Sequence, residues 1–349
     1  MTWFDAMKKI ILVATGRYSI NIDDYYMFYR RTGHQIVAIL YHYSCQYKQW
    51  WHENRFLDPA RNFLFDPIDR DRYRNILWYH ADDLLNKIDH LDFDYVCMGN
   101  GTGVEQRAIV EHVGNEKCLF SEYGWLPWSE HFYISRHGCG SDSEITAFSQ
   151  EDYKDVELRH AEIDVLAKKL DKGTSPPNGD YIYVPLQKDV NDFKFLSSPF
   201  KSNEEFLDFI YEITPNDLTV LVKPHPLYKK AYDLSKYGRF VNISGNNYSK
   251  YKLYKNMLAM ICINSTSILE ALSYNGRIFA YGEDVFVNKN ILNYQVFDKG
   301  LFYSALNNEI DEDDRRCFIS LLFERQISRE RCLKNDRNYI ESHYWNRCL

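Results

Sequence analysis

The chain has 349 residues, of which 45% are hydrophobic and 26% charged, a composition of folded globular proteins rather than disordered ones. Its net charge of −7 disfavours general nucleic-acid binding, which needs a positive surface. The eight cysteines form no CxxC pair, and no apolar run approaches the roughly eighteen residues of a membrane span. We therefore expect a cytoplasmic protein with two domains.

Short apolar runs alternate with helical patterns along the first half. Strands are predicted at residues 10–14, 35–41, 75–79, 94–98 and 117–121, and helices at 82–88 and 104–113. A longer amphipathic helix is predicted over 152–170, before the Pro/Gly-rich linker 171–179. This alternation indicates a parallel sheet with helices on both faces.

The same alternation restarts after the linker. Strands are predicted at residues 181–186, 219–222, 239–243, 258–263 and 277–281, with a helix at 204–213. The domains are therefore predicted at 1–170 and 180–310, followed by C-terminal helices over 311–349. Two Rossmann-like parallel-sheet domains facing a cleft form an α/β fold of GT-B type, an outline shared with periplasmic binding proteins and some epimerases. Neither half opens with GxGxxG, which disfavours a dinucleotide dehydrogenase.

Two apolar runs of the second half stop abruptly at polar residues. The run LTVLVKPHP delivers Lys223 and His225 at its end, where two prolines prevent a continued strand. The run LAMICI ends in Asn264, Ser265, Thr266 and Ser267, and a helical pattern follows. Open α/β sheets bind ligands beyond the carboxyl ends of their strands, and a helix start offers N–H groups to a phosphate. These residues predict a nucleotide-phosphate pocket; the alternative is a helix cap and a turn histidine.

Four short motifs occur in a fixed order. They are SEYGWLP (121–127), YVPLQKDVND (183–192), KPHP (223–226) and NSTSILEAL (264–272), the last followed by Gly276. In this order they resemble bacterial capsule-polysaccharide synthesis proteins and the retaining β-Kdo glycosyltransferases of capsule and lipopolysaccharide assembly. Those enzymes take Kdo (3-deoxy-D-manno-oct-2-ulosonic acid) from CMP-β-Kdo on a GT-B-type fold. The resemblance covers about residues 122–282.

The resemblance implies roles in donor binding. His225 and Pro226 match the HP motif, whose histidine contacts the CMP phosphate, and Lys223 adds positive potential. The segment from Asn264 to Ser267 matches the phosphate-binding helix start. Glu270 lies where it could accept hydrogen bonds from ribose hydroxyls, and Gln187 is a candidate donor at a strand end.

The resemblance also implies catalytic roles. A double displacement needs a carboxylate nucleophile and a general base for the acceptor hydroxyl. We assign Asp192 as nucleophile and Glu122, which matches a family glutamate, as base. Asp189 remains the alternative nucleophile, because the family acid usually follows the glutamine by three or four residues, whereas here Asp189 is nearer to Gln187 and Asp192 is further. Without the resemblance, Asp192 would be interpreted as a loop cap and Glu122 as a solvated strand end.

Because CMP carries a single phosphate, no metal or other cofactor is expected. The Kdo carboxylate still needs a cation, for which Arg17 and Arg136 are candidates. The expected partners are the CMP-sugar donor and an oligosaccharide or lipid-linked saccharide acceptor, with peripheral association to the inner membrane or an assembly complex. The alternatives are a transferase using CMP-sialate or a nucleoside-diphosphate sugar, and a non-catalytic subunit of a polysaccharide-assembly complex.

Overall fold

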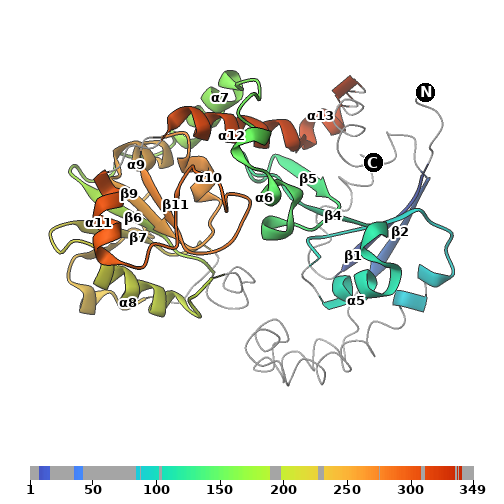
Figure 1. Cartoon of the computed structure of the whole chain (residues 1–349), viewed down its shortest axis with the longest axis horizontal. Coiled ribbons are helices and arrows are strands. Elements are labelled where there is room, and N and C mark those ends of the chain that lie inside the picture. The colour runs from blue at the N-terminus through green and yellow to red at the C-terminus, as the bar shows by residue number, and fades with distance from the viewer. Residues whose placement is uncertain are drawn as a thin grey trace. The chain divides into compact units, whose positions relative to one another are not determined.

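The structure is a computed structural model. It describes residues 8–15, 35–41, 84–86, 88–101, 104–188, 198–226, 232–274, 276–307, 311–334, 336 and 338–339. The chain folds into two compact units, each built around its own sheet (Figure 1). The first comprises Met1–Gly124, Trp128–Glu144 and Arg325–Leu349, and the second Trp125–Pro127 and Ile145–Glu324. Among the described residues, no helix combines the length and the apolar character that a membrane span requires.

The first unit contains a six-stranded sheet in the order β12-β5-β4-β3-β1-β2. Its parallel strands are β1 (Lys9–Thr15), β2 (Gln35–Tyr41), β3 (Tyr95–Met98) and β4 (Cys118–Tyr123). The four predicted strands at these places are confirmed, as is the helix after β3, α5 (Val104–Val113). Residues 84–86 and 88–89 are helical as predicted, whereas the strand predicted at 75–79 lies outside the described residues.

Two strands at one end of this sheet form antiparallel pairs and were not predicted. Strand β5 (His131–Ser135) pairs with β4, and β12 (Ile327–Ser328) pairs with β5. The β4–β5 connection depends on Gly124, whose N–H donates to the His131 carbonyl at 2.8 Å. A Cβ at position 124 would clash with His131, so the close approach of these strands requires glycine.

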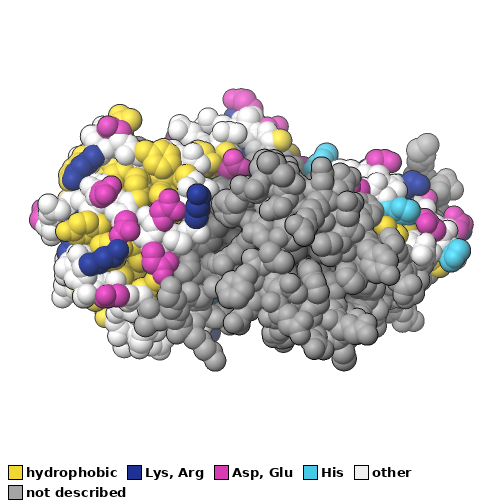
Figure 2. All heavy atoms as spheres, turned by 90° about the horizontal axis from the view of Figure 1, so that it is seen from below, with side chains coloured by type: hydrophobic (Ala, Val, Ile, Leu, Met, Phe, Trp, Pro, Cys, Tyr) yellow, Lys and Arg dark blue, Asp and Glu magenta, His cyan; other side chains and the backbone are white. Residues whose placement is uncertain are grey.

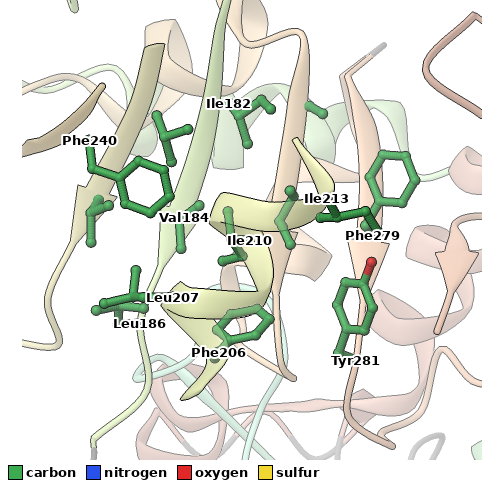
Figure 3. Packing of buried hydrophobic residues seen from close by; sticks show 14 of the residues in the cluster. Ile182, Val184, Leu186, Phe206, Leu207, Ile210, Ile213, Phe240, Phe279 and Tyr281 are labelled. Carbon is green, nitrogen blue, oxygen red and sulfur yellow. The ribbon is translucent and has the colours of Figure 1, made fainter. Parts of the chain in front are cut away.

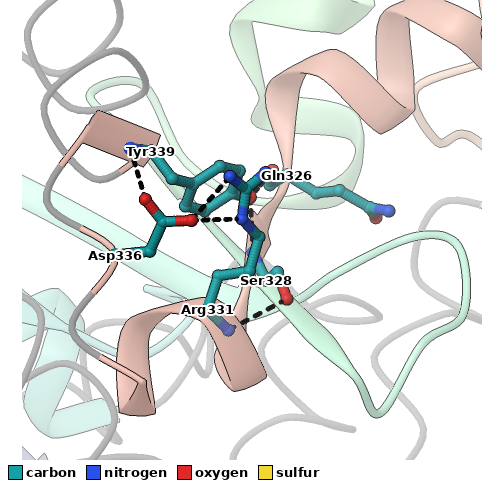
Figure 4. A network of polar contacts seen from close by, with 5 residues as sticks. All are labelled: Gln326, Ser328, Arg331, Asp336 and Tyr339. Carbon is teal, nitrogen blue, oxygen red and sulfur yellow. Dashed lines mark hydrogen bonds and ion pairs between the residues drawn. The ribbon is translucent and has the colours of Figure 1, made fainter.

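The C-terminal segment holds β12 against the sheet (Figure 4). Helix α13 (Arg329–Leu333) follows β12, and the hydroxyl of Tyr339 accepts a hydrogen bond from the Ser328 N–H at 2.7 Å. The Arg331 guanidinium stacks on the Tyr339 ring at 3.9 Å and donates to Asp336 at 2.6 Å. Tyr339 also joins the core cluster on one face of the sheet.

The second unit contains a parallel sheet in the order β8-β7-β6-β9-β10-β11. Its strands are β6 (Tyr181–Pro185), β7 (Thr219–Lys223), β8 (Phe240–Asn242), β9 (Ala259–Cys262), β10 (Arg277–Ala280) and β11 (Asn293–Tyr294). Numbered from β6, this is the order 3-2-1-4-5-6 of the Rossmann fold, whose ligand crevice lies where the order reverses. Here that switch point lies between β6 and β9.

Helices pack against both faces of this sheet. Side chains alternate along each strand, so Ile182, Val184 and Leu186 point together toward α8 (Asn203–Ile213) (Figure 3). Helix α11 (Lys299–Asn307) adds Phe302 to the same core. On the opposite face, the Tyr181 hydroxyl donates to the Leu253 carbonyl of α9 (Lys250–Asn256) at 2.9 Å.

The predicted helix over 152–170 begins later than expected, as α7 (His160–Leu170). A capping box between Ser149 and Asp152 closes a short 3₁₀ turn instead. The Arg159 N–H then donates to Ser320 of α12 (Glu312–Arg325) at 3.0 Å, a tertiary contact that fixes the chain before α7.

The compact units also differ from the predicted domain boundaries. We assigned α7 to the first domain, but it groups with the second unit, because it packs against α9 and because Ser249 donates to Asp171 just beyond it. The tail divides as well, since residues from Arg325 onward group with the first unit.

On the described part of the face in Figure 2, basic and acidic side chains are interspersed.

Candidate functional site

The carboxyl ends of three neighbouring strands bring together most of the predicted donor-binding residues. Gln187 follows β6, Lys223 and His225 end β7, and Asn264 follows β9. Because β7, β6 and β9 are adjacent and parallel, these residues lie at one edge of the sheet. The Gln187 side chain donates to the Asn264 side chain at 3.4 Å, directly across the switch point.

Gln187 and Asn264 are buried and form the floor of this edge. The Asn203 side chain donates to the Gln187 carbonyl at 2.7 Å, and the Asn264 amide donates to the Glu283 carbonyl at 3.3 Å. A Cβ on Gly282 would press on Asn264 and Ile263, so this strand end also needs glycine. The hydrogen bonds of Gln187 and Asn264 therefore connect the loops that follow β6, β9 and β10.

The hydroxyl-rich segment precedes a short helix, α10 (Ser267–Ala271). Ser267 is buried, whereas Ser265 and Thr266 are partly exposed. The Ser265 hydroxyl accepts from the Ser267 N–H at 3.2 Å, whereas the N-cap residue Thr266 makes no capping bond through its side chain. Because α10 has only five residues, its dipole contributes less than the sequence pattern implied. The exposed hydroxyls of Ser265 and Thr266 are thus the groups that a ligand can reach.

Lys223 and His225 are both half-buried at the end of β7, and Pro226 is exposed. The Lys223 carbonyl accepts from the Leu186 N–H at 2.9 Å, which extends the pairing of β6 and β7 to the edge. Burial lowers the pKa of Lys223, and the charge of Lys250 lowers it further, while Glu270 acts in the opposite direction. The edge therefore contains a partly desolvated cation.

Glu270 on α10 is buried and has partners other than the expected ribose. Lys250 donates to both of its carboxylate oxygens, at 3.0 and 2.8 Å, and the Tyr254 hydroxyl donates at 2.6 Å. Neither Lys250 nor Tyr254 was predicted as a site residue from the sequence. Their spacing of four residues, which places them on one face of α9, was the available signal.

Glu122 lies in the first unit, one residue before the end of β4. Its carboxylate accepts from the Asn100 side chain at 3.0 Å and from the Tyr123 N–H at 2.9 Å. Asn100 follows β3, so both residues lie at the carboxyl edge of the first sheet. Glu122 is half-buried, and both of its carboxylate oxygens accept a hydrogen bond.

Arg136 follows β5 in the first unit, and its role in binding the donor carboxylate stays a prediction. It donates to the Tyr95 hydroxyl at 3.1 Å and stacks on that ring at 5.3 Å. By strand alternation and register, Tyr95 lies on the sheet face opposite Glu122 and at the amino end of β3. Arg17, Asp189 and Asp192 lie outside the described residues.

The described residues contain no group of three or more His, Cys, Asp or Glu side chains that could hold a metal ion. The edge of the second sheet contains amides, hydroxyls, lysines and an imidazole, together with the Glu270 carboxylate that Lys250 and Tyr254 hold. The lysines, amides and hydroxyls can donate hydrogen bonds to oxyanions and sugar hydroxyls.

Comparisons with known proteins agree with the motifs. The family described as capsule polysaccharide biosynthesis protein matches residues 144–292. No curated protein matches the sequence. Among solved structures, the β-Kdo 2,7 transferase KpsC of Thermosulfurimonas dismutans is similar, with 15% identity and a TM-score of 0.55 over 95% of this chain and 99% of that chain.

Two further structures are more distant. The β-Kdo 2,4 transferase KpsC of the same organism has 11% identity and a TM-score of 0.42, covering 65% of this chain and 79% of that one. The UDP-GlcNAc 2-epimerase of Methanocaldococcus jannaschii has 14% identity and a TM-score of 0.38, covering 90% and 99%. The family match confirms the predicted resemblance, and the first KpsC structure supports the GT-B-like fold.

Proposed function

We propose that this chain, whose residues 144–292 match the capsule polysaccharide biosynthesis family, is a retaining Kdo transferase. It would move Kdo from CMP-β-Kdo to an oligosaccharide or lipid-linked saccharide acceptor of a bacterial capsule or lipopolysaccharide. The observation that carries the proposal is the edge at the switch point. There the KPHP end of β7 and the NSTS end of β9 lie on either side of β6, and Gln187 after β6 is bonded to Asn264 of NSTS.

The donor phosphate belongs at this edge. The His225 imidazole and the hydroxyls of Ser265 and Thr266 can donate hydrogen bonds, and Lys223 supplies charge. Departure of CMP leaves an anion, which preorganised donors in a partly desolvated site stabilise. A single phosphate has less charge to neutralise than a diphosphate, so we propose that no metal takes part.

The transfer is proposed as two displacements. Asp192 attacks the anomeric carbon, the bond to the phosphate oxygen breaks, and CMP leaves with the electron pair. The acceptor hydroxyl then attacks the same carbon, Glu122 takes its proton, and the Asp192 carboxylate is released. Two inversions give net retention. Asn100 orients Glu122 through its hydrogen bond.

Calorimetry with CMP tests the donor site. His225→Ala should weaken CMP binding by about 1–3 kcal/mol, as for loss of a hydrogen bond to a charged group. His160→Ala, at the exposed start of α7, is the matched control and should bind like the wild type. Unchanged affinity in His225→Ala, or a strict requirement for Mg²⁺, would show that the site is misplaced.

Mass spectrometry tests the nucleophile. Incubation with CMP-Kdo without acceptor should add one Kdo to the intact protein, and peptide mapping should place it on Asp192. An adduct on Asp189 corrects the residue and keeps the mechanism. An α-linked product, seen by NMR, excludes the double displacement.

A donor panel tests the substrate. Release of CMP from CMP-Kdo but not from CMP-sialate supports the proposal. Turnover of CMP-sialate or of a nucleoside-diphosphate sugar would instead show that the chain is a transferase with that donor. Binding without any turnover, across the panel and with added acceptor saccharides, would favour a non-catalytic subunit. We also propose peripheral association with the inner membrane or an assembly complex.

A further inference from the structure

Two lysines share one buried carboxylate at the carboxyl edge of the second sheet. Lys250 is bonded to both oxygens of Glu270, and Lys223 lies close enough for the charges of Lys250 and Glu270 to act on it. The Glu270 side chain is 11% exposed, whereas that of Lys250 is 40% exposed. The carboxylate is therefore covered and a positive charge faces outward.

Glu270 has little capacity left for a ribose. A carboxylate offers about four acceptor sites, and three are occupied by the two bonds from Lys250 and the one from Tyr254. Its contacts instead fit a role in orienting Lys250. Tyr254 is itself fixed by its ring contact with Tyr183 of β6, whose centroid lies 6.0 Å away.

The position of Lys250 is not explained by helix stability. It is the first residue of α9, after the cap Ser249, and the first turn contains no acidic residue. A cation there opposes the helix dipole, which favours negative side chains at a helix start. In the crossover between β8 and β9, however, the start of α9 lies at the carboxyl edge where ligands bind.

We propose that Lys250, oriented by Glu270 and Tyr254, forms with Lys223 an oxyanion subsite for the sugar-nucleotide donor. The inference rests on the proposed function and deepens it, because it names a further cation for an oxyanion of the donor. The oxyanion is either the phosphate or the sugar carboxylate of the donor. Both are bound by the same chemistry, and binding assays separate them.

The test compares Lys250→Met with a matched surface control. Lys236 donates to Asp208 at 2.7 Å, and Asp208 also accepts from the Tyr237 hydroxyl at 2.7 Å. Lys236→Met therefore removes the lysine from a similar Lys–carboxylate–Tyr group that does not lie at the ligand-binding edge. The double variant Lys250→Met with Glu270→Gln leaves no buried carboxylate unpaired, and it serves if the single variant folds poorly.

Affinities for cytidine and CMP and the KM for CMP-Kdo are measured in each variant. If the phosphate is bound, CMP affinity falls at least about tenfold in Lys250→Met while cytidine affinity is unchanged. If the carboxylate is bound, CMP affinity is unchanged and the KM for CMP-Kdo rises by a similar factor. Equal losses for cytidine and CMP, or no change in a folded variant, would overturn the subsite.

A thermal-unfolding experiment with inorganic phosphate, without any nucleotide, tests the subsite independently of the proposed transferase function. Inorganic phosphate should raise the thermal midpoint of the wild type and of Lys236→Met more than that of Lys250→Met. This difference, with no binding of CMP to the wild type, would retain the oxyanion subsite and reject the transferase proposal. Identical shifts in all three proteins would count against the subsite whatever the donor is.

Discussion

Replacing Arg315 by methionine should destabilise the second unit, although it removes a buried charge. Arg315 on α12 is 1% exposed. Its Nε donates to the Ile291 carbonyl at 2.8 Å, and one Nη donates to the carbonyls of Tyr274 and Gly276 at 2.9 and 3.0 Å. These carbonyls precede β10 and β11, so one side chain holds the loops that lead into both strands.

The sign follows from two opposing terms. Three hydrogen bonds from a charged group contribute about 1.5–3 kcal/mol each, or about 4.5–9 kcal/mol together. Burial lowers the pKa of Arg315 from 12.5 to about 10. At about 1.4 kcal/mol per pH unit, this amounts to roughly 3 kcal/mol against the charged form. Methionine keeps most of the aliphatic volume, so the net loss should be about 1.5–6 kcal/mol.

Urea unfolding of the full chain, with hydrogen exchange at the Phe279 amide of β10, measures the effect. Arg239→Met is the control, because Arg239 also donates to backbone carbonyls, those of Tyr211 and Thr214, but from a partly exposed position. Water can replace its bonds there, so its loss should stay below about 1.5 kcal/mol. An Arg315→Met variant as stable as the wild type would show that desolvation dominates.

Three further results are expected. Glu122→Gln should leave folding and CMP binding intact but lower transfer about 10²–10⁴-fold in a product assay, and near-normal turnover would make Glu122 structural. Phe206→Ala, in the core beneath β6, should cost about 3–5 kcal/mol in chemical unfolding, and a loss under about 1 kcal/mol would contradict the packing. Because burial and Lys250 lower the pKa of Lys223, raising the pH removes its charge before that of an ordinary lysine. Calorimetry should then show CMP affinity declining as pH approaches 10.5 from below, whereas constant affinity would remove Lys223 from the site.

Strands that are apolar and flanked by polar residues were predictable, because their burial depends on their own composition. Strand β12 was not, since its two residues lie within a charged, helical tail and pair with β5 through contacts made by Tyr339. The late start of α7 likewise depends on a bond from Arg159 to a residue far along the chain. Periodicity carries no information on such tertiary contacts.

The residues of the candidate site were likewise predictable only in part. The strand ends at Lys223 and Asn264 were visible as abrupt changes from apolar to polar residues, and the parallel order of the sheet brings them together. Lys250 and Glu270 are twenty residues apart and meet only because α9 and α10 lie on either side of β9 in the chain. Strand β5 was not predicted, and because it runs antiparallel to β4, Arg136 lies toward the opposite edge of the sheet from Glu122.

The return of β12 to the first sheet affects synthesis of the protein. Until Ile327 and Ser328 emerge from the ribosome, β5 is the outer strand of the described sheet and has an unpaired edge, which is prone to aggregation. Roughly 190 residues separate the two strands, so at about 5–20 residues per second the edge stays open for on the order of 10–40 s. The second unit, continuous from Ile145 to Glu324 apart from Trp125–Pro127, can fold during that interval. The first unit is thus the last to be completed, and nascent chains stalled before β12 should be the ones that need a chaperone.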